Sequence, residues 1–314
     1  MKVSVIIPFY DLERYARECL DSVLAAVKGR EDRVEVICVD DGSTDSTPGI
    51  LDEYASRYPF VKAVHKPNGG EGSARNAGLA AASGEWITFL DGDDLWLVPV
   101  LSEFFSAGMR HPDVDIIGFR YLPFDDGAAV PAPLVSSSET VYDVCREIPT
   151  AAIVDLGVFP TFFRRKKFAG ILFTRLPLGA DRLYVAECLA RADRIVMSAS
   201  AVHGYRVRAD SMAHSVWNER KLVSMIDFIV GSLNALHAVG KRIERGGIVY
   251  LAHALLGWAA KYTARLADGR ERKAVSRRLA EAIRGLDSRQ LPLAYRLRRR
   301  IYLMLNSKSR TEES

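Results

Sequence analysis

The stretch Trp86-Ile87-Thr88-Phe89-Leu90-Asp91-Gly92-Asp93-Asp94 joins an apolar run directly to three carboxylates. The apolar part predicts a buried strand, so the acidic residues stand where that strand ends. Neighbouring carboxylates repel one another, and burying them without a partner is costly. Hard oxygen ligands suit Mg²⁺ or Mn²⁺, which in turn hold phosphate oxygens. The stretch therefore indicates nucleotide-diphosphate chemistry, and the alternative is a polar turn in which an Asp caps the following helix.

Strand and helix patterns alternate on both sides of this stretch. Runs rich in β-branched residues predict strands at 3–7, 34–39, 61–65, 86–90 and 114–119. Apolar residues at helical spacing predict helices at 14–27, 46–58, 73–82 and 99–110. Such alternation is typical of an α/β fold with a mainly parallel central sheet. Residues 121–138 are rich in Pro, Gly, Ala and Ser and predict a loop, 159–206 look mixed with a helix at 180–192, and the chain beyond 216 is helical.

Polar residues follow three of the predicted strands. These segments are Pro8-Phe9-Tyr10-Asp11, Asp40-Asp41-Gly42-Ser43 and Asp91-Gly92-Asp93-Asp94. In open α/β sheets, ligands bind beyond the carboxyl ends of the strands, so the three segments predict one polar crevice. For the second segment alone, a turn with a helix cap is the alternative.

A glycine-rich segment from Asn68 to Gly78 leads into a helix of small residues. It has neither the Lys and spacing of a phosphate-binding P-loop nor the position of a dinucleotide-binding glycine motif. Arg75 on this helix is expected to reach an anion or a carbonyl, and a surface arginine is the alternative.

The composition limits the class of protein. The chain has 314 residues, 48% of them apolar, which fits one large domain or a domain with an extension. Cys19, Cys38, Cys145 and Cys188 form no Cys-x-x-Cys pair, so a zinc site is disfavoured and a reducing cytoplasm is expected. No stretch predicts a signal peptide or a membrane-spanning helix.

Taken in order, four strings resemble the family 2 nucleotide-sugar-dependent glycosyltransferases. They are Val5-Ile6-Ile7-Pro8-Phe9-Tyr10, Val39-Asp40-Asp41-Gly42-Ser43-Thr44-Asp45, Ala74-Arg75-Asn76-Ala77-Gly78 and Phe89-Leu90-Asp91-Gly92-Asp93-Asp94. The resemblance covers residues 1–120 firmly and 155–215 loosely. It implies a Rossmann-like nucleotide-sugar fold of the GT-A type at 1–215, with a nucleotide-sugar-binding half at 1–120 and an acceptor half at 121–215. A helical C-terminal extension at 216–306 and a disordered tail at 307–314 would follow.

The resemblance also implies roles for single residues. Pro8 and Tyr10 would flank the base, Asp40 would accept a hydrogen bond from uracil N3–H, and Arg75 would lie against the base or its carbonyl. Asp91 would lie near the ribose and the metal, and Asp93 would ligate Mn²⁺ or Mg²⁺. The metal would bridge both phosphates of a nucleotide-sugar donor, most simply a UDP-sugar, and stabilise the charge that builds up as the sugar departs.

The second half resembles the family less closely. An Asp that opens a helix is the family's general base, and it falls on Asp181, with Ala180 where relatives have Glu. Without the resemblance, Asp181 is equally well a helix cap. Either Arg206 or Arg208 could contact the diphosphate, and we choose Arg206. His214 is a candidate third metal ligand, since neutral imidazole suits Mn²⁺, with an ordinary loop residue as the alternative.

Two departures from the family pattern stand out. Asp11 occupies a position where relatives commonly have Asn, and Phe159-Pro160-Thr161-Phe162-Phe163 replaces a Trp-Asn-Lys-like stretch. The second departure is expected on the acceptor side and points to an unusual choice of acceptor.

The charge is unevenly distributed. From Arg270 onward the chain carries 13 Lys and Arg against 5 Asp and Glu, although the net charge of the whole chain is only +4. The segment 291–305 places several arginines among apolar residues, so it predicts either a helix that contacts an anionic membrane surface or one docked on the body. Nucleic-acid binding is disfavoured, because no matching fold or stacking signature accompanies the charge.

The sequence thus predicts a metal-dependent, inverting glycosyltransferase that acts on a hydroxyl of a glycan or lipid-linked acceptor in surface polysaccharide synthesis. Its expected location is the cytoplasm, with possible peripheral contact at the inner face of the membrane. The alternatives are a catalytically inactive glycan-binding or scaffold relative and a sugar-1-phosphate nucleotidyltransferase. The second is disfavoured because Pro8-Phe9-Tyr10-Asp11 stands where that class has a glycine-rich loop.

Overall fold

The computed structural model describes residues 1–208, 218–254 and 269–285. The chain forms two compact units. The first comprises Met1–Cys145, Leu156–Arg175 and Arg191–His214, and the second comprises Arg146–Asp155, Leu176–Ala190 and Ser215–Ser314. The predicted boundaries at residues 120 and 215 stay predictions. His214 and the basic segment 291–305 lie outside the described residues.

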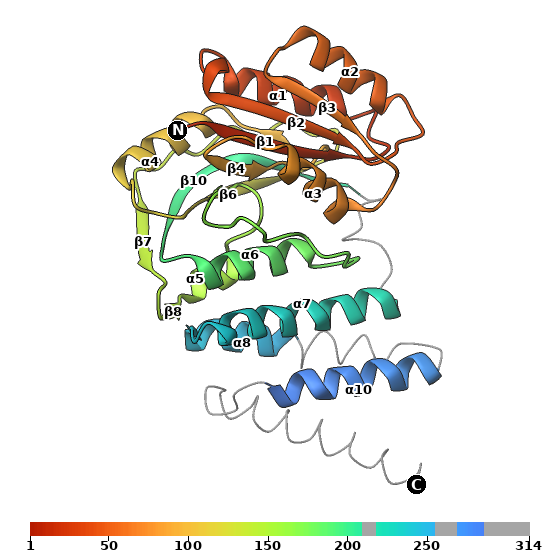
Figure 1. Cartoon of the computed structure of the whole chain (residues 1–314), viewed down its shortest axis with the longest axis vertical. Coiled ribbons are helices and arrows are strands. Elements are labelled where there is room, and N and C mark those ends of the chain that lie inside the picture. The colour runs from red at the N-terminus through yellow and green to blue at the C-terminus, as the bar shows by residue number, and fades with distance from the viewer. Residues whose placement is uncertain (209–217, 255–268, 286–314) are drawn as a thin grey trace. The chain divides into compact units, whose positions relative to one another are not determined.

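A nine-stranded mixed sheet forms the centre of the first unit (Figure 1). Its main path runs β3-β2-β1-β4-β9-β6-β10-β5, and β7 pairs with β10. Six strands point the same way, and only β5, β7 and β9 are antiparallel to their neighbours. The strands are β1 (Val3–Phe9), β2 (Val34–Asp40), β3 (Val61–His65), β4 (Trp86–Phe89), β5 (Leu95–Trp96), β6 (Ile116–Asp125), β7 (Glu139–Asp143), β9 (Thr161–Arg164) and β10 (Arg194–Val207). The predicted α/β class with a mainly parallel sheet is confirmed.

Helices cover both faces of this sheet. The helices α1 (Ala16–Val27), α2 (Thr47–Arg57) and α4 (Val100–Arg110) share one core with the odd-numbered residues of β1. The helix α3 (Glu71–Ala81) packs on the opposite face, where a Cβ on Gly78 would meet Ile6 Cγ2 at 2.3 Å. Figure 1 shows α1 and α2 on one side of β1 and α3 on the other. Because side chains alternate along a strand, the apolar run of β1 supplies both cores.

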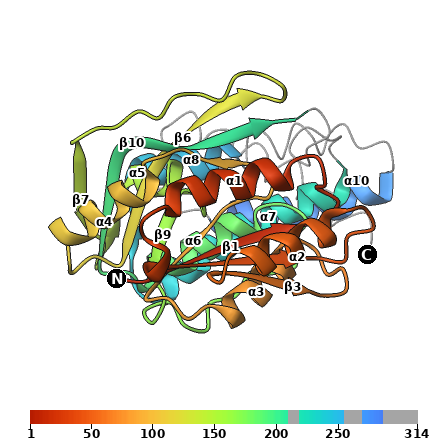
Figure 2. The ribbon, with the colours of Figure 1, turned by 90° about the horizontal axis from the view of Figure 1, so that it is seen from above.

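Two segments differ from the sequence-based expectation. The strand β6 continues to Asp125, although a loop was expected from residue 121. The strand β10 has 14 residues, although short strands were expected between 159 and 206. Both differences have the same cause. The strands β6 and β10 pair with each other as far as Asp125 and Val207, and local composition does not reveal such pairing. The loop after β6 then returns along the unit toward β7 (Figure 2).

The second unit is mainly helical among its described residues. It contains α5 (Thr150–Val154), most of α6 (Ala180–Arg191), α7 (Glu219–Ala238), α8 (Arg245–His253) and α10 (Gly269–Gly285). The short strands β8 (Glu147–Ile148) and β11 (Arg242–Ile243) pair in parallel. Close approach of α6 and α7 requires a glycine, since a Cβ on Gly231 would lie 2.9 Å from Leu183 Cδ1. In the described part of the chain, every helix is too short or too polar to span a bilayer.

A buried carboxylate fastens the amino-terminal edge of the sheet. Glu35 on β2 is 4% exposed, and its Oε1 accepts hydrogen bonds from Ser4 Oγ at 2.6 Å and from the backbone N–H groups of Ser83 and Gly84 at 2.6 and 3.0 Å. Its Oε2 pairs with Lys62 Nζ at 2.9 Å. Burial alone would raise the pKa of Glu35, but these hydrogen bonds prevail and lower it to about 2.

We predict that Glu35→Gln lowers the free energy of unfolding by about 2–3 kcal/mol at pH 7. A carboxyl group with a depressed native pKa stabilises the fold above its unfolded pKa. That contribution disappears as the pH falls toward 2, so the difference between the two proteins should shrink at pH 3. Urea unfolding at both pH values measures the effect, and Asp32→Asn at an exposed position is the control. A difference independent of pH would contradict the prediction.

Candidate functional site

The carboxyl ends of the parallel strands gather the predicted polar residues of the first unit. Asp40 is the last residue of β2, and Asp91 to Asp94 follow β4. The turn after β4 approaches the end of β1 closely, because a Cβ on Gly92 would lie 2.6 Å from Phe9 Cδ1. Only glycine therefore fits between the carboxylates Asp91 and Asp93. The segments lie at one edge of the sheet as expected, and the crevice between them stays a prediction.

Arg75 bridges α3 to this acidic turn. Its Nη2 donates to Asp91 Oδ1 at 2.6 Å and to Glu71 Oε1 at 2.5 Å. The Arg75 side chain is 2% exposed, and its guanidinium lies 5.3 Å from the ring centroid of Phe173. The expectation that Arg75 reaches an anion is met by the protein's own carboxylates, and the surface alternative is excluded. Its contact with a nucleotide base stays a prediction.

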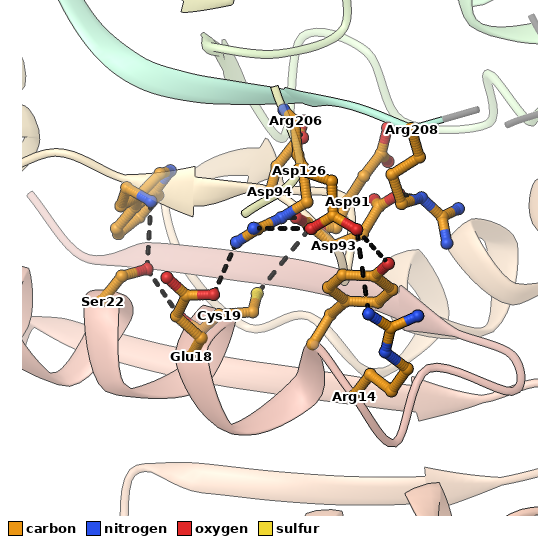
Figure 3. A network of polar contacts seen from close by, with 12 residues as sticks. Arg14, Glu18, Cys19, Ser22, Asp91, Asp93, Asp94, Asp126, Arg206 and Arg208 are labelled. Atoms are coloured by element: carbon orange, nitrogen blue, oxygen red, sulfur yellow. Dashed lines mark hydrogen bonds and ion pairs between the residues drawn. The ribbon is translucent and has the colours of Figure 1, made fainter. Parts of the chain in front are cut away.

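Asp93 and Asp94 are bound by residues of β10 and its end. Asp93 Oδ2 pairs with Arg208 Nε at 2.8 Å. Asp94 is 1% exposed, and its Oδ2 lies 2.8 Å from Nε2 of the fully buried His203, while its Oδ1 accepts from the Arg206 backbone N–H at 2.8 Å. Figure 3 shows these carboxylates clustered with Arg206 and Arg208 above α1. The acidic turn is therefore held by side chains that follow it by more than a hundred residues.

Carboxylates outnumber guanidinium groups around the acidic turn. Among the described residues, the ion pairs there contain six carboxylates, four guanidinium groups and one imidazole, namely Glu18, Glu71, Asp91, Asp93, Asp94 and Asp126 with Arg14, Arg75, Arg206, Arg208 and His203. Burial, together with repulsion by Asp94 and Asp91, raises the pKa of Asp93 to about 7. A divalent cation would remove both the excess charge and this repulsion.

The prediction that Arg206 binds the donor stays a prediction, and the structure shows which protein groups its side chain contacts. Its Nε donates to the Asp93 carbonyl at 2.8 Å, Nη1 to Asp126 at 3.2 Å and Nη2 to Glu18 at 2.6 Å. The side chain is 5% exposed and lies between the rings of Tyr15 and Phe124. A guanidinium with this many protein partners fixes the acidic turn. Arg208, which is 17% exposed, is the better placed of the two for a ligand.

Reciprocal hydrogen bonds lock together the loops after β1 and β2. The Asp11 backbone N–H donates to Ser43 Oγ at 3.0 Å, and Asp11 Oδ1 accepts from the Thr44 backbone N–H at 2.7 Å. Asp11 has a φ of 50°, a conformation that Asp and Asn adopt more readily than other residues with a side chain. The departure from the family's Asn at this position thus keeps both the backbone conformation and the acceptor.

The proposed base-binding residues lie in or next to these loops. Pro8 belongs to β1, and Tyr10 directly after it is 48% exposed. Asp40 Oδ1 accepts from the Ser43 N–H at 3.0 Å, and its Oδ2 lies 3.2 Å from His65 Nδ1. His65 was not predicted from the sequence. Its hydrogen bonds, first to Asp52 and then to Asp40, raise its pKa.

Asp41 organises the glycine-rich loop before α3. Its carboxylate pairs with Lys66 Nζ and accepts from the Gly69 and Gly70 backbone N–H groups, the latter at 2.7 Å. The turn requires glycine at Gly42, where φ is 78° and a Cβ would lie 2.8 Å from the Asn68 nitrogen. Asp41 therefore ties the glycine-rich loop to the end of β2.

Asp181 lies in the second unit, in the first turn of α6. Among the described residues its carboxylate has no hydrogen-bond or ion-pair partner, which gives no support to the helix-cap alternative. Its role as a base stays a prediction, as does metal binding by His214.

The donor set of the acidic turn fits a hard divalent cation. In the described part of the chain no three His, Cys, Asp or Glu side chains are arranged as a complete metal site. Asp91 and Asp93 nonetheless offer carboxylate oxygens in a surplus of negative charge. Mg²⁺ sites of this kind take one or two carboxylates from the protein and their other ligands from phosphates and water. The residues present therefore fit a metal that arrives with a diphosphate.

Comparison with known proteins agrees with this geometry. The family model described as glycosyl transferase family 2 matches residues 4–166. Glycosyltransferase GlyA of Streptococcus pneumoniae is 25% identical over 79% of this chain and 36% of its own length. Poly(ribitol-phosphate) beta-glucosyltransferase of Bacillus spizizenii is 29% identical over 69% of this chain and 34% of its own. The chain thus spans about a third of the length of these relatives.

A crystal structure of residues 1–349 of S. aureus TarS with UDP-GlcNAc covers 100% of this chain and 93% of its own, with a TM-score of 0.74 and 22% identity. Similarity at this level of identity shows a shared fold.

We predict that Asp41→Asn loosens the loop at Gly69 and Gly70 while the sheet stays intact. The neutral amide loses the charge-assisted bonds to two backbone N–H groups and to Lys66, so amide exchange at these glycines should rise about tenfold. Amide exchange measured by NMR tests this, with Asp52→Asn as a control. Unchanged protection at both glycines would contradict the assigned role.

Proposed function

This chain belongs to glycosyl transferase family 2, and from that premise we propose that it transfers a sugar from a nucleotide donor to an acceptor hydroxyl. The donor is a UDP-sugar, and the acceptor is a glycan or lipid-linked glycan of a cell-surface polymer. The observation that carries the proposal is the buried acidic turn after β4, with Arg75 beside it and the locked loops of β1 and β2 next to it. The naming of one relative as a poly(ribitol-phosphate) glucosyltransferase supports the acceptor class.

Donor binding is assigned to the first unit. Tyr10 supplies an exposed ring for the base, and Asp40 supplies an acceptor for a base N–H. Asp91 and Asp93 would hold Mn²⁺ or Mg²⁺ together with the two phosphates, and the bound cation would stabilise the charge on the departing diphosphate. On binding, Arg208 can exchange Asp93 for a phosphate oxygen, because both are anionic partners of a guanidinium that is partly exposed.

We assign Asp181 as the general base that accepts the proton of the acceptor hydroxyl. As the acceptor oxygen forms its bond to the anomeric carbon, the bond from that carbon to the phosphate oxygen breaks and the diphosphate leaves with its electrons. The hydroxyl proton passes to the Asp181 carboxylate. A single displacement of this kind inverts the anomeric configuration.

All four cysteines are free and three of them are buried, which supports a reducing compartment such as the cytoplasm. Contact of segment 291–305 with an anionic membrane surface remains part of the proposal.

We predict that UDP-sugars with Mn²⁺ raise the melting temperature and that Asp93→Asn abolishes this rise. Ligand binding to the native state stabilises it by mass action. Without ligand, Asp93→Asn should melt at the same or a higher temperature, because Asp91 and Asp94 no longer repel a third charge. Thermal shift across a panel of UDP- and GDP-sugars, followed by assay of UDP release, measures both effects. Asp32→Asn at the other end of the sheet is the control.

If no nucleotide sugar stabilises the protein and Asp93→Asn alters neither the melting temperature nor UDP release, the protein is an inactive scaffold relative. Stabilisation by GDP-sugars alone would keep the transferase and reject the UDP assignment.

We predict that Asp181→Asn lowers sugar transfer at least 100-fold and leaves UDP binding within a few-fold. The amide keeps the shape of the carboxylate but cannot accept the hydroxyl proton, and loss of a positioned base costs about 10²–10⁴ in rate. Calorimetry with UDP and Mn²⁺ and a transfer assay separate the two effects. A variant with the full transfer rate would remove Asp181 from the mechanism.

A further inference from the structure

A row of four rings runs along the sheet of the first unit toward its surface. Phe159 is stacked on His203 with centroids 5.0 Å apart and on Tyr205 with centroids 6.2 Å apart, at interplanar angles of 16° and 12°. Tyr205 in turn meets Tyr121 edge to face at 5.6 Å. Tyr121 and His203 are paired neighbours on β6 and β10, and Tyr205 follows His203 by two residues, so these three side chains share one face.

The row begins in the core and ends in solvent. His203 is fully buried, Phe159 and Tyr205 are partly buried, and Tyr121 is 50% exposed. Among the described residues neither phenol hydroxyl has a hydrogen-bond partner. Folding alone does not require a tyrosine pair at the surface with unused hydroxyls, because the core of this unit is already closed by the rings of Phe104, Phe119 and Phe162.

The row is connected to the acidic turn. His203 Nε2 lies 2.8 Å from Asp94 Oδ2, so the innermost ring touches the proposed diphosphate-binding turn. Burial and then the charges of Asp94, Asp91 and Asp93 raise the pKa of Tyr205. Tyr121 and Tyr205 also lie in the carboxyl-terminal halves of β6 and β10, and both strands run parallel to β4. The rings therefore reach the same edge of the sheet as the acidic turn, on the side away from Tyr10 and Asp40.

The chemistry of this face selects one class of ligand. A sugar ring has an apolar C–H face and a polar rim, so it can lie on an aromatic face while its hydroxyls meet phenol oxygens. A nucleotide base already has a separate proposed site at β1 and β2. A wholly apolar lipid chain would leave both phenol hydroxyls without a partner, which is costly.

We propose that Tyr121 and Tyr205, backed by Phe159, form a carbohydrate-binding platform that stacks a sugar ring of the acceptor. The arrangement of the rings is the evidence for carbohydrate binding, whereas the identification of the bound sugar as the acceptor rests on the proposed transferase function. The departure of the Phe159 segment from the family pattern places an unusual ring at the base of this platform.

Two variants and two controls test the platform in the full chain. Tyr121→Ala removes the exposed ring, and Tyr205→Leu removes the second ring while keeping apolar volume. Tyr121→Phe keeps the ring and deletes the hydroxyl, and Tyr58→Ala removes a partly buried tyrosine at the end of α2. The probes are the methyl glycosides of glucose, galactose and N-acetylglucosamine, titrated by saturation-transfer NMR. The thermal shift by UDP-sugars with Mn²⁺ is recorded for each protein.

We expect the wild type to bind at least one glycoside through its ring C–H protons. Tyr121→Ala and Tyr205→Leu should weaken that binding about tenfold, Tyr121→Phe less than fivefold and Tyr58→Ala not at all. The nucleotide-dependent thermal shift should be unchanged in all four. In a transfer assay, the loss should appear in the KM for the acceptor and leave the KM for the donor unaltered.

The platform is overturned if the wild type binds none of the three glycosides, or if Tyr121→Ala binds as well as the wild type. It is also overturned if the Tyr121→Ala loss is matched by Tyr58→Ala, since the effect would then be general destabilisation. If the wild type binds a glycoside but shows no thermal shift with nucleotide sugars, the transferase function is rejected and the carbohydrate site is retained.

Discussion

The architecture of the first unit depends on holding three neighbouring acidic side chains together at the end of a buried strand, where they repel one another. Each of Asp91, Asp93 and Asp94 has its own cationic or imidazole partner, and these partners come from two distant parts of the chain. Arg75 brings in α3, while His203 and Arg208 bring in β10. Because an unpaired buried carboxylate costs several kcal/mol, these contacts fix the position of β10 relative to β4.

Much of this was accessible from the sequence because it is local. The parallel strands, the small-residue helix and the acidic turn follow from residue patterns within a few positions, and the order of four weak motifs predicted the family. What could not be predicted depends on distant pairing. No local signal places His203 against Asp94 or Arg206 against Glu18, because the members of each pair are more than a hundred residues apart in the sequence.

The composition of residues 121–138 was misleading for a related reason. Pro, Gly, Ala and Ser lower the strand propensity of the segment, yet its first five residues complete β6 because β10 lies beside them. The ring row on these strands was invisible as a motif, since Tyr121 and Phe159 lie tens of residues from His203 and Tyr205 in the sequence and only the fold brings them together. Asp11 shows the opposite case, where a departure from the family is explained by a single local backbone conformation.

The strand order has a consequence for how the chain reaches its native state. Within the sheet, β6 pairs only with β9 and β10, both of which come later in the sequence. On the ribosome, the first four parallel strands can assemble from residues 1–90, whereas β6 must wait as an unpaired strand until residue 164 has emerged. An exposed strand edge during that interval invites pairing with other chains. Strands β1 to β4 would thus be paired well before β6 and β10, which carry the ring row. Nascent chains at this intermediate stage would need chaperones most.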